Sequence, residues 1–195
     1  ALLGGSASGV SYNAIFGPAR AAYAEGNSPQ KLVANYGNTR IYLTSGDGHN
    51  CPQDPLTPMS GLDAGTELVI QALQAPFAAA VRAAGADVTA VTTCGVHTFG
   101  VWNRAFAAAR AWGFFKPVPE SPPKWTYRTI ATAGEMWGLR FRFAEPPATV
   151  AEFERSGRGL TATGRGSVRI RGGHGCRLRG ELPFKRRLPH ACLRR

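Results

Sequence analysis

The chain has 195 residues, which suits one large or two small domains, and 44% of them are hydrophobic, enough to form a core. It has no run of 18 apolar residues, and its apolar start, ALLGGSASGV, lacks a basic segment; we therefore expect neither a transmembrane helix nor a signal peptide. The formal charge of +11 is confined to one end: residues 1–120 hold 7 cations and 7 acids, and residues 121–195 hold 16 and 5.

The first region predicts alternating strands and helices. Residues 40–44 (RIYLT) form a short apolar run before SGDG, typical of a buried parallel strand, and residues 49–60 predict a loop. Residues 66–84 have apolar side chains at helical spacing, with a kink or break expected at Pro76. A second strand at 88–94 and a second helix at 101–115 follow. This pattern indicates a parallel α/β unit, and two strands alone would need more strands to form a stable sheet.

The second region differs in kind. Four prolines within residues 117–123 predict a stiff linker, and beyond it apolar and polar residues alternate with period two between glycine-rich breaks. We therefore expect a partial α/β domain at 1–116, a linker at 117–123, and a small antiparallel β-sandwich or barrel of five to six strands at 124–195.

One face of this predicted β domain is lined with arginine side chains. The arginines that alternate with core residues are Arg140, Arg142, Arg169, Arg171, Arg177 and Arg179. They predict a surface for an anionic cell-wall polymer or an acidic membrane, with a merely solvated sheet face as the alternative. Because the aromatic residues fall on the opposite face, nucleic acid is the less favoured partner.

His97 is the main candidate for chemistry. It directly follows the predicted strand at 88–94, and sites in α/β sheets form at the carboxyl ends of strands. A lone histidine in a loop is more often structural than catalytic. No cysteine or histidine cluster has zinc spacing, so we expect no metal site and no cofactor.

The surrounding segment, GVHTFGVWN, resembles the G-T-H-S-W-x-x-W-N segment of the antigen 85 mycolyltransferases and related esterase D-like enzymes. His97, Trp102 and Asn103 match identically, and Thr98 and Phe99 match conservatively. Two upstream segments are also similar to that family: KLVANYGNTRIY at 31–42, and YNA with FGP between residues 12 and 18. The resemblance covers about residues 6–115.

This resemblance implies the C-terminal part of an α/β-hydrolase parallel sheet and a Ser–Glu–His triad with His97 as the base. By family spacing the acid is Glu67, thirty residues before His97. Asp54 and Asp47 are alternatives, and Glu67 could instead be an ordinary charge in the first turn of a helix. Phe99 and Trp102 would lie beside His97 and could bind the acyl chain, although core packing is the favoured role of Trp102.

No convincing nucleophile is present. The G-x-S-x-G pattern of a nucleophile elbow is not met: GSASG at 5–9 puts Ala7 at the central position, and GGSAS at 4–8 puts Ser6 there but ends in Ser8. By resemblance, residues 1–10 match the strand and loop that follow the elbow helix. We therefore expect the nucleophile to lie before residue 1.

The four cysteines fit this interpretation. Their even number allows three pairings and is compatible with an exported protein, with four free thiols as the alternative. In the family-like arrangement Cys51 and Cys94 would bridge two loops beside the site. Cys176 and Cys192 lie outside the resemblance, but they bracket the last predicted β run and could pin the C-terminal segment.

Together these features predict a fragment of a secreted or cell-wall-associated serine esterase or acyltransferase, acting on an acyl ester of a lipid or glycolipid. The alternative is a non-catalytic hydrolase remnant whose basic β domain binds an anionic polymer or membrane surface.

Overall fold

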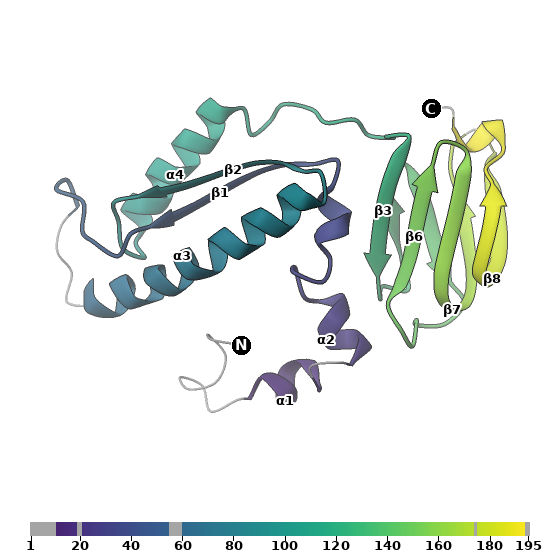
Figure 1. The fold of residues 1–195 in the computed structure, drawn as a ribbon, viewed down its shortest axis with the longest axis horizontal. Coiled ribbons are helices and arrows are strands. Elements are labelled where there is room, and N and C mark those ends of the chain that lie inside the picture. Colours follow the sequence, from purple (N-terminus) through teal and green to yellow (C-terminus); the bar gives the residue numbers. More distant parts are fainter. Residues whose placement is uncertain (1–10, 19–20, 55–59, 174, 194–195) are drawn as a thin grey trace. The chain divides into compact units, whose positions relative to one another are not determined.

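A computed structural model describes residues 11–18, 21–54, 60–173 and 175–193 (Figure 1). The chain divides into two compact units. One is Thr39–Val118, and the other combines Pro119–Arg195 with the segment that ends at Asn38. Ser6 and Ser8, and the strand and loop expected over residues 1–10, lie outside the described residues.

The Thr39–Val118 unit is built from β1 (Arg40–Gly46), α3 (Ser60–Ala83), β2 (Asp87–Thr93) and α4 (Phe99–Trp112). The two strands pair in parallel from Arg40 opposite Asp87 to Gly46 opposite Thr93, and α3 is the crossover between them. Since parallel strands point the same way, the loops that follow β1 and β2 meet at one edge of the sheet.

The expected α/β-hydrolase fold is wrong. Among the described residues the parallel sheet has two strands, and the larger sheet is antiparallel. The physical reason is that the βαβ pattern specifies one strand–helix–strand unit, and the segment before it forms short helices that add no strand. These helices are α1 (Tyr12–Phe16), α2 (Ala22–Gly26) and the 3-10 helix η1 (Val33–Tyr36).

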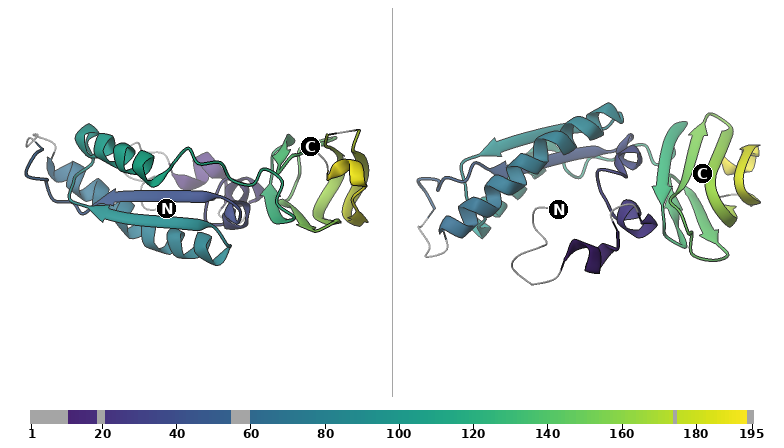
Figure 2. Two further views of the ribbon diagram at one scale, coloured as in Figure 1. Left: turned by 90° about the horizontal axis from the view of Figure 1, so that it is seen from above. Right: turned by 60° about the horizontal axis from the view of Figure 1, so that its bottom comes forward.

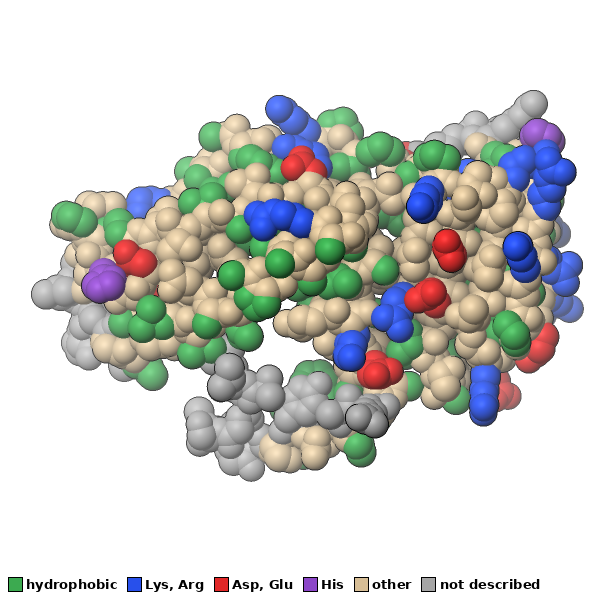
Figure 3. All heavy atoms as spheres, in the orientation of Figure 1, with side chains coloured by type: hydrophobic (Ala, Val, Ile, Leu, Met, Phe, Trp, Pro, Cys, Tyr) green, Lys and Arg blue, Asp and Glu red, His purple; other side chains and the backbone are tan. Residues whose placement is uncertain are grey.

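The small sheet leaves apolar side chains of its unit exposed. Large hydrophobic residues at the surface are Leu62, Leu68, Leu73, Phe99, Trp102, Phe106, Phe114 and Phe115. Trp102, Phe106 and Phe114, which all fall within the predicted second helix at 101–115, are therefore not core residues here. In the view of Figure 3, hydrophobic side chains are visible over α3, and Lys and Arg are more frequent over the antiparallel sheet.

The other unit contains a near-closed antiparallel sheet of six strands (Figure 2). The strands are β3 (Lys124–Thr129), β4 (Ala133–Met136), β5 (Leu139–Phe143), β6 (Ala151–Ser156), β7 (Gly159–Arg171) and β8 (Arg177–Arg187). Their order is β3-β6-β7-β5-β4, and β8 pairs with β7. The long strand β7 thus pairs with β6 through its first half, with β5 through its second half, and with β8 along its other edge.

The register of β7 against β8 shifts between Ala162 and Gly166. The irregularity separates the part of β7 that pairs with β6 from the part that pairs with β5. Gly164 and Gly166 have φ angles of 119° and 106° there, a conformation that other residues rarely adopt. A β-bulge of this kind bends a strand and increases its twist, which helps the sheet to curl toward closure.

Alternating side chains fill the interior of this sheet. Along β5, Leu139, Phe141 and Phe143 are buried, whereas Arg140 and Arg142 are exposed. Phe153 of β6 is fully buried. The core also contains the disulfide between Cys176 and Cys192, whose Cα atoms are 4.7 Å apart. Cys192 belongs to the 3-10 helix η2 (His190–Cys192), so the bridge ties the end of the chain to the core.

The segment before β1 joins this unit through η1. The Asn35 side chain donates to the Arg128 carbonyl (2.9 Å) and accepts from the Arg128 backbone N–H (2.6 Å), which attaches η1 to β3. Residues 116–123, the proline-rich segment, contain neither helix nor strand.

Candidate functional site

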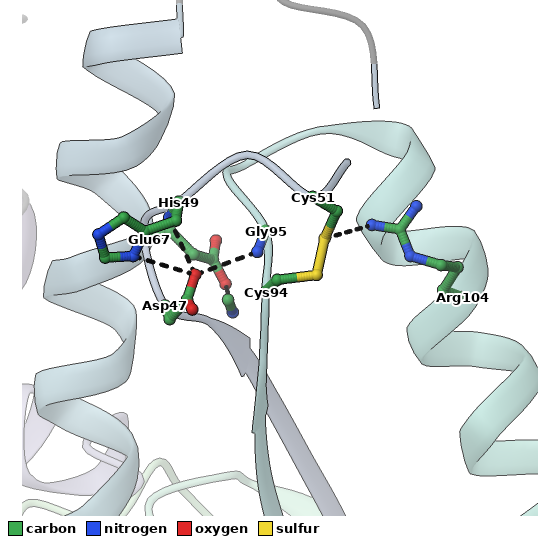
Figure 4. A network of polar contacts seen from close by, with 8 residues as sticks. Asp47, His49, Cys51, Glu67, Cys94, Gly95 and Arg104 are labelled. Atoms are coloured by element: carbon green, nitrogen blue, oxygen red, sulfur yellow. Dashed lines mark hydrogen bonds and ion pairs between the residues drawn. A yellow bond between two sulfur atoms is a disulfide. The ribbon is translucent and has the colours of Figure 1, made fainter. Parts of the chain in front are cut away.

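The loops after β1 and β2 are joined by several bonds at the carboxyl edge of the parallel sheet (Figure 4). The Asp47 carboxylate accepts the backbone N–H groups of His49 (2.9 Å) and Gly95 (3.2 Å), and the Gly48 N–H donates to the Gly95 carbonyl (3.0 Å). Cys51 and Cys94 form a disulfide with their Cα atoms 5.3 Å apart. These bonds fix the loop that leads directly into His97.

Glu67 and His97 lie in contact beside these loops. His97 Nδ1 is 3.0 Å from Glu67 Oε2, and Glu67 Oε1 accepts the backbone N–H of Gly46. The Glu67 side chain is 5% exposed, whereas that of His97 is 34% exposed. The carboxylate is therefore shielded from water while the imidazole can still reach a substrate.

One turn of α3 holds both the backbone and the ring of His97. The His97 N–H donates to the carbonyl of Asp63 (3.3 Å), and Glu67, four residues further along the helix, contacts the ring. Residues four apart lie on the same face of a helix, so the two contacts come from adjacent positions. The Gly46 and Asp63 contacts were not anticipated from the sequence, because both depend on how the loops fold.

An aromatic side chain packs against the imidazole, and a second one packs against the first. Trp102 packs edge-on against His97 with ring centroids 4.9 Å apart, and Phe99 packs edge-on against Trp102 at 4.8 Å. Phe99 is 77% exposed and Trp102 is 41% exposed. Core packing therefore does not describe Trp102, and both rings offer apolar surface next to His97.

The two alternative acids have other partners. Asp54 makes a bidentate ion pair with Arg104 of α4, with both N–O distances 2.6 Å, and Arg104 also donates to Cys51 Sγ (3.2 Å). The Arg104 guanidinium lowers the pKa of Asp54. Asp54 thus anchors the disulfide loop to α4.

Asp47 has a similar structural role in the loop after β1. The backbone N–H groups of His49 and Gly95 lower its pKa, although partial burial opposes this. Of the three acids that the sequence offered, Glu67 is the one hydrogen-bonded to His97 in the described structure.

A nucleophile is not in place among the described residues: no serine, threonine or cysteine side chain there is hydrogen-bonded to the His97 ring. Nor do those residues bring together three or more metal-ligating side chains.

The six arginines of the predicted anionic-polymer surface lie on β5, β7 and β8, and all are exposed. They are Arg140, Arg142, Arg169, Arg171, Arg177 and Arg179. They lie on the outer face of the antiparallel sheet, in the unit that does not contain His97.

Comparison of this chain with protein-family models, with curated proteins and with solved structures found no match. Within the part of the chain that the structure describes, no helix has the length and apolar character needed to span a membrane. The two disulfides fit an extracellular or secreted protein.

Proposed function

We propose that His97 and Glu67 are the base and its orienting acid in a site for ester hydrolysis or acyl transfer. The observation that carries this proposal is the 3.0 Å contact between His97 Nδ1 and a buried carboxylate that is itself fixed by the Gly46 N–H. The resemblance of the His97 segment to antigen 85-like enzymes supports the same chemistry.

The contact with Glu67 suits Nε2 as the acting nitrogen. In the neutral imidazole, donation of Nδ1–H to the carboxylate leaves Nε2 free to accept a proton from a hydroxyl that attacks an ester carbonyl. The carboxylate then stabilises the imidazolium, which returns the proton to the departing alcohol. Water as the second acceptor completes hydrolysis, and a sugar hydroxyl completes acyl transfer.

The attacking hydroxyl belongs, in this proposal, to a serine outside the described residues. The substrate is an acyl ester of a lipid or glycolipid, whose chain Phe99 and Trp102 contact. The two disulfides support a site of action outside the cell or at its wall.

The test is acyl-ester cleavage by the chain expressed with any residues that its gene encodes before Ala1. We expect release of p-nitrophenol from p-nitrophenyl esters. His97→Ala and Glu67→Gln should each lower kcat by about 10³-fold or more, because the base is lost or held in the wrong tautomer.

Asp54→Asn is the matched control, since Asp54 is also a shielded acid of the same unit but contacts Arg104. It should leave kcat within about threefold of the parent, because the Asp54 carboxylate pairs with Arg104 and not with the His97 ring. Turnover that survives His97→Ala would contradict the proposal. So would a correctly folded chain with no turnover, which would favour the non-catalytic alternative.

A further inference from the structure

The strand register arranges the six exposed arginines in two rows across three neighbouring strands. Arg140 of β5 lies opposite Arg171 of β7, which lies opposite Arg177 of β8. The second row pairs Arg142 of β5, Arg169 of β7 and Arg179 of β8 in the same way. We call these six residues the arginine grid.

The grid is not neutralised from within the chain. None of its six side chains takes part in an ion pair among the described residues. Acids stand at its margin: Glu135 opposes Arg140 from β4, and Glu181 follows Arg179 by two residues on β8. Like charges directly opposite each other on a sheet are destabilising, so the grid has an electrostatic cost that a bound anion would remove.

Depressions lie between the arginines. One of about 580 Å³ is lined by Arg140, Arg142, Arg169 and Arg171, with Glu135 and Phe141 also in its lining. A second of about 450 Å³ is lined by Arg142, Arg169 and Arg179, with Phe143 also in its lining. A third, of about 260 Å³, is lined by Arg169, Arg171, Arg177 and Arg179. Arg169 lines all three, so the depressions adjoin one another at this residue.

We propose that the arginine grid binds a linear polymer that carries repeated phosphate groups. Guanidinium groups bind phosphate oxygens through two parallel hydrogen bonds, and neighbouring strands place successive guanidinium stems about 5 Å apart. A chain of closely spaced phosphates can therefore contact a whole row and cross into the next depression. This binding is independent of the His97 site.

The surroundings of the grid favour such a polymer over a membrane or nucleic acid. The apolar residues that alternate with the arginines, such as Phe141, Val168 and Ile170, are buried in the core. Phe141 and Phe143 line the first two depressions, but each is only 3% exposed. Among the described residues the grid therefore offers no protruding aromatic side chain to enter a bilayer and no open ring on which bases could stack. The grid can therefore recognise its ligand through charge and through the geometry of guanidinium–phosphate hydrogen bonds.

The experiment measures binding of the 195-residue chain to inorganic polyphosphate over a range of salt concentrations. A triple variant, Arg142→Gln, Arg169→Gln and Arg171→Gln, removes three grid charges. Its control, Arg165→Gln, Lys185→Gln and Arg187→Gln, removes three exposed charges of β7 and β8 outside the grid. Both variants have the same net charge.

We expect the grid variant to lose at least about tenfold in affinity at low salt and to lower the salt slope by roughly one for each lost contact. The affinity of the control should remain within about threefold of the parent, because the three charges that it lacks lie outside the grid and salt screens their attraction to the polymer. Melting temperatures keep the test interpretable: the grid variant should melt no lower than the parent, since it loses cross-strand repulsion.

Equal losses in the two variants would overturn the proposal in favour of net charge alone. Competition by orthophosphate as effective as by polyphosphate, at equal phosphate concentration, would overturn the polymer part. Tighter grid-dependent binding to phosphatidylglycerol vesicles or to single-stranded DNA than to polyphosphate would show a membrane or nucleic-acid surface instead.

Discussion

At Gly46 the chain passes between the Glu67 side chain and the carbonyl of Gly95, and a Cβ atom there would collide with both. The Gly95 carbonyl is itself bonded to the Gly48 N–H, so it cannot move without breaking the loop contact. We expect Gly46→Ala to lower the free energy of unfolding of the Thr39–Val118 unit by about 1–3 kcal/mol, a typical cost of overpacking. Urea denaturation measures it.

Gly65→Ala is the control for that substitution. A Cβ at Gly65 meets no atom within 4 Å, and the residue lies inside α3, where alanine is the better helix former. It should stabilise the unit by about 0.5–1 kcal/mol. Equal stabilisation by Gly46→Ala would contradict the close approach of Gly46 to the Gly95 carbonyl.

Asp54 gives the molecule an acid-sensitive contact. Because Arg104 holds its pKa below the ordinary value of 3.8 in the folded state, the ion pair stabilises the fold above that value. The contribution is lost as the pH falls through the lowered pKa. We expect the Tm difference between parent and Asp54→Asn to be constant above about pH 5 and to shrink below about pH 4.

Thermal melts from pH 7 to acid, with each chain also carrying Arg104→Gln, provide the control for this pH dependence. Without the guanidinium the Asp54→Asn difference should be small at every pH. A Tm difference that persists unchanged into acid would mean that the ion pair is not its cause.

The sequence predicted the residues of the His97 site better than their surroundings. Glu67 was chosen by the spacing found in the family that the His97 segment resembles, and in the structure its carboxylate contacts the His97 ring. Spacing could not reveal that Gly46 and Asp63 hold the same pair, since backbone donors and acceptors carry no residue signature. Core packing was the favoured role of Trp102, because aromatic side chains at helical spacing usually face a core, whereas in the structure Trp102 is 41% exposed.

At the scale of elements, α3 differs from its prediction at its start and at Pro76. The expected helix began at Thr66, yet α3 begins at Ser60, because Gly61 and Gly65 weaken the helical signal without preventing the helix. The helix also continues through Pro76. Pro76 is exposed, so the carbonyl that loses its partner can bond to water.

In the β strands, alternation is the most informative signal, because each strand has one buried and one exposed face. The residues expected on the core side of β5 and β7 are buried, and their arginine neighbours are exposed. Alternation could not show that β7 would pair with three strands, since that depends on the bend near Gly164.

Phe153→Ala tests the assignment of one buried and one exposed face to each β strand. Phe153 is fully buried and packs against Phe141 and Phe143, so its removal should cost about 3–5 kcal/mol. Glu154→Ala, at the next and exposed position of β6, should stay within about 0.5 kcal/mol. Denaturant unfolding of both variants compares them, and similar losses would contradict the assignment of faces.

At the scale of the whole molecule, the fold class was the least predictable property. A βαβ pattern with a histidine after its second strand is local information and is compatible with sheets of many sizes. The number of strands depends on long-range pairing, and in the described structure the parallel sheet has two. Residues 40–112 were therefore assigned to nearly the right elements but to the wrong sheet.

Each compact unit contains one disulfide, which leads to a prediction for the whole chain. Cys51–Cys94 closes a loop of 43 residues in the Thr39–Val118 unit, and Cys176–Cys192 closes one of 16 residues in the other. Replacing either pair by serine should destabilise its own unit by about 2–5 kcal/mol, because the unfolded chain regains freedom.

Hydrogen exchange followed by mass spectrometry locates the effect: protection should fall between residues 39 and 118 for the first pair, and between 124 and 192 for the second. The matched control is the intact mass of the parent chain with and without reductant, which should show two disulfides. Four free thiols in the native protein, or protection lost evenly across both units in either variant, would contradict the prediction.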